Sequence, residues 1–323
     1  MRVYTDISTL PAFKAPVITI GSFDGLHRGH QAILNQVKTL AKESGGESVI
    51  ITFDPHPRQV IYPKAGDLSL ITTLEEKIWL MEQFEVDNLV VVPFTVEFAQ
   101  LSADEYIEKF LIEKFRPKYI VIGYDHRFGL NRQGDIHFLK WYSHKANYEV
   151  IELDEQVVDN ITISSSKIRK ALEKSDLRTA TGLLNHPFLL MGKVMKGNRL
   201  GTSIGYPTAN ISFQNKIKLI PPDGIYAVYV HHNSIIYKGV LYIGVKPTVT
   251  ADNKRVIEVH IIDFAQDIYD EDVIIEFIEF IRADMKFDSI EAMRSQIALD
   301  KEAALEVLGK IGNTFQSKSE TIL

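Results

Sequence analysis

The chain has 323 residues, which is enough for two domains with separate cores. Its formal net charge of −6 argues against nucleic acid as a partner, because no excess of cations can neutralise phosphates. It contains no cysteine, which excludes disulfide bonds and suits a reducing compartment. No stretch has the length of a membrane span, and the first residues lack the apolar run of a signal peptide. We therefore expect a soluble, cytoplasmic protein that does not associate with membranes, and the sequence leaves homo-oligomers open.

The first half of the chain alternates short apolar strands with helices. Strand patterns occur at residues 17–20, 48–53, 89–93, 119–123 and 148–152. Helical spacing of apolar residues occurs between them, at about 73–85, 102–114 and 135–146. Ser102 and Glu105 form a capping box for the middle helix. Such an alternation predicts an α/β fold of Rossmann-like type, with a parallel sheet covered on both faces. Ligands of these sheets lie beyond the carboxyl ends of the strands.

The first strand runs into a glycine turn and then into a helix. Gly21 and Gly25 allow a tight turn that brings the backbone close to a ligand. The helical pattern begins near His30, and free N–H groups and the helix dipole at such a junction attract anionic oxygens. His27 lies three residues before His30, so both imidazoles can face the same phosphate.

A His-x-x-His pair also occurs in metal sites and on ordinary surfaces. No third ligand follows at helical spacing nearby, and Phe23 and Asp24 between the glycines favour phosphate chemistry. Neither the P-loop motif nor the dinucleotide fingerprint occurs in the chain. Residues 21–30 resemble the Gly-x-Phe-Asp-Gly-x-His-x-Gly-His signature of the nucleotidyltransferase superfamily, whose histidines stabilise charge on the α-phosphate of a nucleoside triphosphate.

Three further polar motifs follow later strands, as a ligand site at the carboxyl ends requires. They are Asp54-Pro-His-Pro57, residues 123–129 and residues 163–169. The last one opens a helix with three serines, Lys167 and Arg169, which indicates a second phosphate cradle. Helix capping alone would explain one of the serines.

The four motifs occur in the order seen in the FMN adenylyltransferase half of prokaryotic bifunctional riboflavin kinase/FAD synthetases. This resemblance implies that His27 and His30 contact the phosphates of ATP, and that Asp125 helps to hold substrate. It implies that Arg169 binds phosphate with help from the serines, and that the Asp54-Pro-His-Pro turn lies near the flavin. The binding residues implied for this half are Gly21, Phe23, Asp24, Gly25, Asp54, His56, Asp125, Ser164 and Ser165.

Beyond residue 184 the pattern changes to closely spaced β segments. Strand patterns occur at residues 189–196, 224–231, 235–243, 255–262 and 272–281. They predict a small antiparallel β-barrel, with a hairpin turn at 232–234. A final helix begins at a predicted Asp288-x-x-Glu291 cap and continues through Leu308. The predicted domains are 1–184 and 185–312, followed by a tail at 313–323.

Two features of the second half carry chemistry. Thr208 and Asn210 are two residues apart, so in an extended segment both side chains point the same way. Their oxygens are hard donors that suit Mg²⁺ held by nucleotide phosphates, although a lone Pro-Thr-x-Asn is usually a turn. Glu258 shares a largely apolar face with Val256 and His260, which suits a general base acting on an alcohol. Taken alone, the pattern fits better an exposed glutamate on an edge strand.

Together these features resemble riboflavin kinases. The resemblance implies that Gly205 and Pro207 belong to the nucleotide-binding motif, that Thr208 and Asn210 are ligands of Mg-ATP, and that Glu258 deprotonates the ribityl 5′-hydroxyl. The flavin side of that family's site is matched by residues of the last helix and the segment before it, namely Phe287, Met293, Gln296 and Asp300. The chain departs from the family at Thr202 and Lys196, where many relatives carry Arg and His, and Arg199 is a candidate substitute for the missing guanidinium.

The resemblance implies two reactions in sequence. ATP phosphorylates riboflavin to FMN, and a second ATP then adenylylates FMN to FAD with release of pyrophosphate. Thr202 keeps open a monofunctional FAD synthetase with an impaired kinase module. A different class of protein, a sensor that binds flavin nucleotides without turnover, is a second alternative. A cytidylyltransferase is a further alternative, but such enzymes share only the first motif with this chain.

Overall fold

The computed structural model describes residues 1–63, 69–155, 157–158, 161–197, 201, 204–213, 215–246 and 254–319. These residues form two compact units, Met1–Ser165 and Ser166–Leu323. The helices α8 (Ser165–Leu172) and α9 (Leu177–Leu184) precede the barrel, and α9 contacts two of its strands. The division between the units therefore falls before the expected domain boundary at 184, which stays a prediction.

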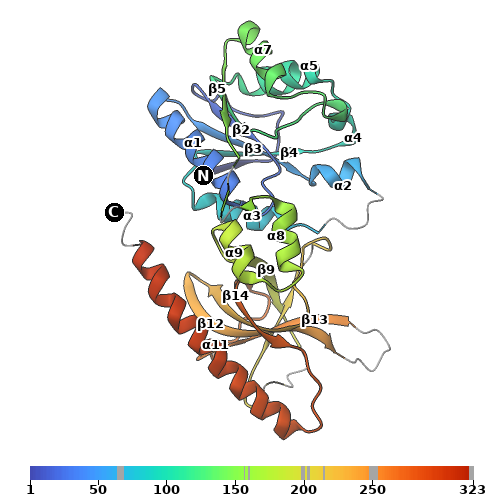
Figure 1. Cartoon of the computed structure of the whole chain (residues 1–323), viewed down its shortest axis with the longest axis vertical. Helices are drawn as coiled ribbons and strands as arrows, with labels where there is room; N and C mark the ends of the chain where they lie inside the picture. Colours follow the sequence, from blue (N-terminus) through green and yellow to red (C-terminus); the bar gives the residue numbers. More distant parts are fainter. Residues whose placement is uncertain are drawn as a thin grey trace. The chain divides into compact units, whose positions relative to one another are not determined.

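A six-stranded parallel sheet forms the centre of the first unit, with the order β1-β4-β3-β2-β5-β6 (Figure 1). The strands are β1 (Arg2–Tyr4), β2 (Val17–Ile20), β3 (Ser48–Asp54), β4 (Asn88–Pro93), β5 (Tyr119–Gly123) and β6 (Glu149–Leu153). The five predicted strands are confirmed to within one residue at each end. The short strand β1 pairs only with β4 at the sheet edge and carries no apolar run, so the sequence pattern did not predict it. A short ribbon of β7 (Val157–Val158) and β8 (Ile161–Thr162) follows.

Helices connect the strands of this sheet. They are α1 (Arg28–Ser44), α2 (Pro57–Ile61), α3 (Leu74–Glu82), α4 (Val96–Ala99), α5 (Ala103–Glu105), η1 (Tyr106–Ile112), α6 (Glu113–Phe115), η2 (Leu130–Arg132) and α7 (Ile136–Ala146). The capping box at the start of α5 is confirmed, because Ser102 Oγ accepts from the Glu105 amide and Glu105 Oε2 accepts from the Ser102 amide, both at 3.1 Å.

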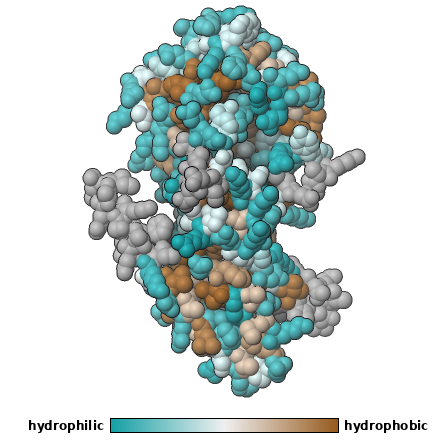
Figure 2. Space-filling model, in the orientation of Figure 1, coloured by the Kyte–Doolittle hydropathy of each residue, from teal (hydrophilic) through white to brown (hydrophobic). Residues whose placement is uncertain are grey.

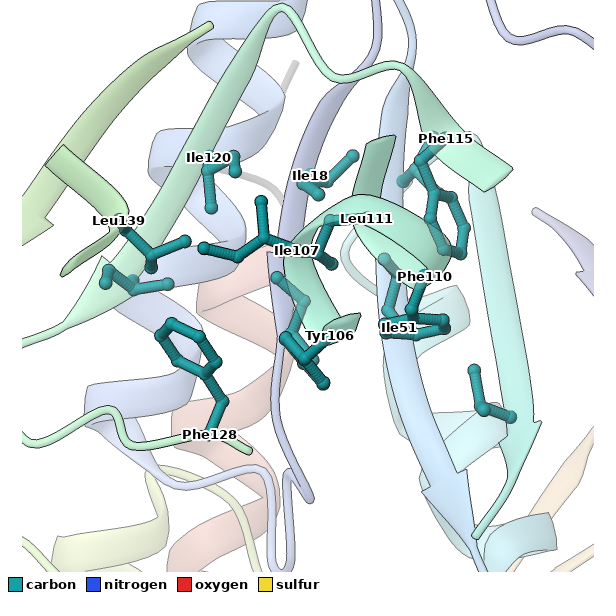
Figure 3. Close-up of a cluster of buried hydrophobic side chains, with 14 of the residues drawn as sticks. Ile18, Ile51, Tyr106, Ile107, Phe110, Leu111, Phe115, Ile120, Phe128 and Leu139 are labelled. Atoms are coloured by element: carbon teal, nitrogen blue, oxygen red, sulfur yellow. The ribbon is translucent and has the colours of Figure 1, made fainter. Parts of the chain in front are cut away.

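The predicted helix at 102–114 contains the π-helical segment η1. Its wider turns place Tyr106, Ile107, Phe110 and Leu111 on one buried face. Figure 3 shows these side chains directed at isoleucines of the sheet. Burial of this apolar face, rather than the backbone pattern alone, holds the segment against the sheet.

The second unit contains a closed antiparallel barrel in the order β10-β13-β12-β11-β14-β9. Its strands are β9 (Phe188–Met195), β10 (Ala209–Ser212), β11 (Gly224–His232), β12 (Ile235–Lys246), β13 (Lys254–Ile261) and β14 (Asp272–Ala283). The predicted barrel and its five strands are confirmed. The predicted hairpin turn is also confirmed, since Asn233 and Ser234 have φ values of 47° and 64° between β11 and β12.

The helix α11 (Ile290–Ser319) packs against β11, β12 and β14 of the barrel (Figure 1). Its residues Ala304 and Leu308 are completely buried there. The predicted cap at Asp288 was wrong by one residue, because Ser289 Oγ accepts the hydrogen bond from the Ala292 amide at 3.0 Å. The helix backbone continues to Ser319, into the stretch expected to be a tail.

Among the described residues, no helix combines the length and apolar character that crossing a membrane requires. On the face drawn in Figure 2, hydrophilic side chains predominate and apolar ones lie between them in small groups.

Replacement of Ile107 by Ala should lower the free energy of unfolding of the first unit by about 3 kcal/mol, because it leaves a cavity in a fully buried face. Val96 is 59% exposed, so Val96→Ala should change that free energy by less than about 0.5 kcal/mol. Urea unfolding followed by circular dichroism measures both variants. Equal effects would contradict the assignment of the η1 face to the core.

Candidate active sites

A cavity of about 270 Å³ lies beyond the carboxyl ends of strands β2 and β5. These two strands are neighbours, but the chain continues from β2 toward one edge of the sheet and from β5 toward the other. The cavity therefore lies at the switch point of the strand order, where parallel sheets hold their ligands. Its walls are formed by Ser22, His27, Gly29, His30, Ala32, Ile33, Gly123, Tyr124, Asp125, Leu153, Asp154, Ile163, Ser164 and Ser165.

The turn between β2 and α1 is fastened by a buried carboxylate. Asp24 is 2% exposed, and its Oδ1 accepts from the amides of Ile71 and Thr72 at 2.9 and 3.0 Å. The hydroxyl of Thr72 in turn accepts from the Gly25 amide at 2.9 Å. Gly25 adopts a φ of 81°, which few other residues tolerate. Asp24 therefore shapes the turn, together with Gly21 and Phe23, and the cavity wall begins at the residues beside it.

The two histidines lie at the amino end of α1. His27 is the N-cap, and its Nδ1 accepts from the His30 amide at 3.4 Å. The two rings stack with a centroid distance of 3.6 Å, and Phe23 packs edge-on against His30 at 5.1 Å. Burial, then the nearby His27 and Lys77, lower the pKa of His30 well below its ordinary value, so the imidazole is neutral at pH 7.

The buried Nδ1 of His30 has no hydrogen-bond partner in the described structure. An unpaired buried polar atom is costly, and such atoms are rare unless a ligand or water completes them. The cavity therefore combines a helix N-terminus, two imidazoles and an unpaired ring nitrogen, an arrangement that suits an anionic oxygen.

Of the other residues predicted for this half, some line the cavity and some lie elsewhere. Asp125, Ser164 and Ser165 line the cavity, and Ser165 Oγ donates to the Asp24 carbonyl at 3.1 Å. His56 instead caps α2, where its Nδ1 accepts from the Arg58 amide. Asp54 is exposed at the end of β3.

Neither Asp54 nor His56 is among the described residues of the cavity wall, so their place near the flavin stays a prediction. Arg169 is half-buried on α8 and belongs to the second compact unit. Its contribution to this site also stays a prediction.

Leu153 and Asp154 of the cavity wall were not predicted, whereas Ser22 and Tyr124 lie within the predicted motifs at 21–30 and 123–129 but were not singled out. Leu153 ends β6, and Asp154 follows it directly. A signal existed, because the rule that ligands lie beyond the carboxyl ends of parallel strands applies to this strand too. The prediction of a ligand site beyond a strand was made only where a recognisable motif follows that strand.

A second cavity, of about 260 Å³, lies within the second unit. Its described walls are formed by Gly201, Ile204, Tyr206, Thr208, Ile225, Val240, Tyr242, Glu258, His260, Arg282, Asp284, Met285, Phe287, Met293, Ile297, Asp300 and Lys301. The residues named from the sequence that are among them are Thr208, Glu258, Phe287, Met293 and Asp300. Gly205 forms the turn before them with a φ of 87°, and Pro207 follows in extended chain.

Strand register brings the two predicted chemical features of the second unit together. Asn210 of β10 pairs directly with Glu258 of β13, and Glu258 pairs directly with Tyr242 of β12. Directly paired residues carry their side chains on the same face of the sheet. Glu258 is only 9% exposed and lies on an inner strand, so it is not the exposed glutamate of an edge strand.

The segment that carries Thr208 and Asn210 is held closely by its neighbours. A Cβ atom at Gly197 would overlap the Asn210 amide, and one at Gly201 would overlap the Tyr206 carbonyl. On the other side, a ring nitrogen of His260, Nδ1, lies 2.8 Å from the Pro207 carbonyl, within hydrogen-bonding distance. The segment is thus fixed relative to β13, the strand of Glu258.

The far wall of this cavity is formed by β14, α11 and the segment between them. Arg282 donates to both carboxylate oxygens of Asp300, at 2.8 and 2.7 Å, and Asp300 is 3% exposed. Phe287 lies against the guanidinium, 5.9 Å from ring centre to Cζ. Tyr242 donates to Asp284 at 3.2 Å, and burial with that carboxylate raises the pKa of Tyr242 to about 12.

Phe287, Met293 and Asp300 were named from the sequence and line this cavity, whereas Arg282, Asp284 and Tyr242 of its wall were not predicted. Single residues in strands carry no local signal of a site, and only the barrel closure brings them together. Thr202 and Arg199 lie outside the described residues. Lys196 is exposed, and its ammonium lies 5.9 Å from the centre of the Tyr269 ring.

The first unit has a cavity suited to an anion at the switch point of its parallel sheet, and the barrel of the second unit has its own cavity. The protein therefore has two candidate ligand sites. The family model described as FAD synthetase matches residues 11–167, and that described as riboflavin kinase matches residues 184–308. Curated relatives described as bifunctional riboflavin kinase/FMN adenylyltransferase match along nearly the whole chain.

The relative from Listeria monocytogenes is 34% identical over 91% of this chain and 93% of its own length. That from Haemophilus influenzae is 37% identical over 89% of this chain and 92% of its own. The chain belongs to the family of bifunctional riboflavin kinase/FMN adenylyltransferases. A crystal structure from Streptococcus pneumoniae, described as a macrolide-efflux protein, shares the fold over 94% of this chain and 97% of its own, with a TM-score of 0.83 and 30% identity.

His126 provides a test of the electrostatics beside the first cavity. Burial, then the charge of Arg132, lower the pKa of His126 from 6.5 to about 4, so the unfolded chain takes up a proton there at a higher pH than the folded one. This ring's contribution to stability is present above pH 6.5 and is lost as the pH falls toward 4. His126→Phe, which keeps a ring next to Phe128, should reduce the loss of unfolding free energy between pH 7.5 and pH 5 by about 1–2 kcal/mol.

Urea unfolding at the two pH values measures the effect. The exposed Val96 serves as the control, since Val96→Ala changes no ionisable group and should leave the pH dependence unchanged. A pH dependence that is identical in wild type and in His126→Phe would contradict the lowered pKa.

Proposed function

We propose that the second-unit cavity converts riboflavin and ATP to FMN and ADP, and that the first-unit cavity converts FMN and a second ATP to FAD and pyrophosphate. The observation that supports the proposal is that each cavity contains the groups its own reaction needs. The first has two imidazoles at a helix N-terminus, and the second has Thr208 and the buried carboxylate of Glu258, which pairs with Asn210 on the next strand. We further propose that the substrates are small molecules, that no nucleic acid is bound, and that the enzyme works in the cytoplasm.

In the adenylylation reaction the phosphate of FMN is already an anion, so no strong base is needed. The bond that breaks joins the α- and β-phosphates of ATP, and charge grows on their oxygens in the transition state. His27, His30 and the free amides at the start of α1 stabilise that charge, with Arg169 as a further phosphate ligand. The neutral state of His30 leaves a ring N–H to donate without the cost of burying a charge.

In the kinase reaction Glu258 accepts the proton of the ribityl 5′-hydroxyl, and that oxygen attacks the γ-phosphorus of ATP. The Thr208 hydroxyl and the Asn210 amide oxygen suit a magnesium ion, because both are hard, neutral donors on a segment held close to Glu258. Mg²⁺ bound there would neutralise charge on the transferred phosphoryl group. The apolar wall with Met285, Met293 and Phe287 suits the flat flavin ring.

Glu258→Gln should slow FMN formation from riboflavin by about 10²–10⁴-fold, because the amide cannot accept the proton, and should leave FAD formation from supplied FMN unchanged. His30→Ala should do the reverse and slow FAD formation by about 10²–10³-fold. Product chromatography with Mg-ATP measures both reactions. Glu279→Gln, at an exposed position of β14, is the matched control. Loss of both activities in each folded variant would contradict the division between the units.

Gly197→Ala should raise the KM for Mg-ATP in FMN formation about tenfold, because the new methyl group displaces the Asn210 amide. Gly182 faces open space in α9, so Gly182→Ala should leave this KM unchanged. Initial rates of FMN formation at varied Mg-ATP concentration give the KM of the wild type and of both variants. An unchanged KM in Gly197→Ala would argue against Asn210 as a ligand of Mg-ATP.

A further inference from the structure

A buried lysine lies beside the first cavity, and neither reaction as proposed above uses it. Lys77 of α3 is only 5% exposed. Burying an ammonium group is costly unless the charge is compensated or used, and lysine is among the residues least often buried. Its Nζ donates to Thr52 Oγ1 of β3 at 3.1 Å. The sequence pattern gave no sign of this residue, which occupies an apolar-spaced position of an ordinary helix.

The hydrogen bond of Lys77 continues to the cavity wall. Thr52 Oγ1 donates its own proton to the carbonyl of Ser22, at 3.4 Å. Ser22 lies in the turn between β2 and α1 and lines the cavity. Thr52 is completely buried, so the hydrogen bond from Lys77 to Thr52 is shielded from water, whereas Ser22 at the end of this hydrogen-bond chain is part-buried and lines the cavity. A hydrogen-bond chain in such a medium transmits position and charge more strongly than one in solvent.

The charges that act on Lys77 come from two elements. Asp24 of the turn and Asp54 of β3 are negative and raise the pKa of Lys77, while burial acts in the opposite direction and is the larger effect. The result is a pKa of about 8 in place of 10.5, so the ammonium is present at pH 7 and is lost at moderately alkaline pH. Lys77 in turn contributes to the lowered pKa of His30, after burial and the neighbouring His27.

Asp24 does not need Lys77 as its hydrogen-bond donor, since two backbone amides already hold its Oδ1. The hydrogen bond of Lys77 goes to Thr52, so the lysine is linked to the turn through Thr52 as well as lying near the charge of Asp24. We propose that Lys77 is a positioning residue of the adenylylation site, which holds the Ser22 carbonyl through Thr52 and places a fixed positive charge behind His27 and His30, where it favours binding of the ATP triphosphate. The inference rests on the proposed function of this cavity.

The test compares Lys77→Met, which removes the charge, with Lys77→Arg, which keeps it. Lys77→Met should lower kcat/KM for ATP in FAD formation at least about tenfold at pH 7. It should also raise the pKa of His30, measured by NMR titration of the imidazole, because a nearby positive charge has been removed. FMN formation by the same molecules should not change, which gives an internal control for folding. Lys42→Met, at an exposed position of α1, controls for the substitution itself.

The pH profile separates a positioning role from a structural one. In the wild type, kcat/KM for ATP in FAD formation should fall as the pH rises through about 8, because the ammonium loses its proton. In Lys77→Arg this alkaline decline should be absent, since a guanidinium stays protonated. A decline that persists in Lys77→Arg, or a Lys77→Met variant with kcat/KM and His30 titration like those of the wild type, would overturn the proposal.

If Lys77→Met does not fold, Lys77→Arg and Thr52→Val decide the question. Thr52→Val keeps the charge but breaks the link to Ser22, so it should lower kcat/KM for ATP and retain the alkaline decline. A Thr52→Val variant with wild-type kinetics would overturn the positioning link. A wild-type chain that makes no FAD would contradict the proposed function, whereas the His30 titration in the Lys77 variants would still test the electrostatic link.

Discussion

The first unit depends on one interaction, in which a buried carboxylate accepts hydrogen bonds from two backbone amides. Asp24 accepts from the amides of Ile71 and Thr72, and this contact fixes a turn that contains residues with positive φ. Because α1 starts directly after the turn, the attachment also sets where the helix dipole and His27 point. Asp24, which the sequence suggests as a substrate ligand, thus holds the turn in place. The residues that face the cavity are its neighbours in the chain, such as Ser22 and His27.

The two units solve the problem of handling phosphate charge by different means. The first presents backbone amides and two imidazoles, of which that of His30 is neutral, and we propose that a buried lysine supplies positive charge near them. The second presents an acidic group and neutral oxygens, which suit a metal-bound nucleotide. This difference follows from the chemistry, because an alcohol must lose a proton to attack, whereas a phosphate is already ionised. If the two reactions proceed as proposed, the two sites of this chain should differ in their dependence on pH and on metal.

Much of the fold was predictable because its strands are continuous apolar runs separated by helices of clear periodicity. The histidine pair was also predictable, since a local motif marks it, whereas the alternation around Glu258 alone favoured an exposed glutamate and only the resemblance to riboflavin kinases singled it out. The residues that escaped prediction act through tertiary contacts. Lys77 looks like part of an amphipathic helix until β3 is placed beside it, and Arg282 finds Asp300 only when α11 folds back on the barrel. Likewise, the cap at Ser289 in place of Asp288 depends on the exact entry of the chain into α11.

The row formed by Asn210, Glu258 and Tyr242 on three adjacent strands has a consequence for how such a barrel can vary in evolution. Adding or deleting one residue inside β10, β12 or β13 would turn alternate side chains to the opposite face and separate the row. Changes in length are therefore tolerated only in the connections between these strands. Among homologous chains, insertions and deletions should accumulate there, while the strands themselves keep constant length even where their apolar residues are exchanged.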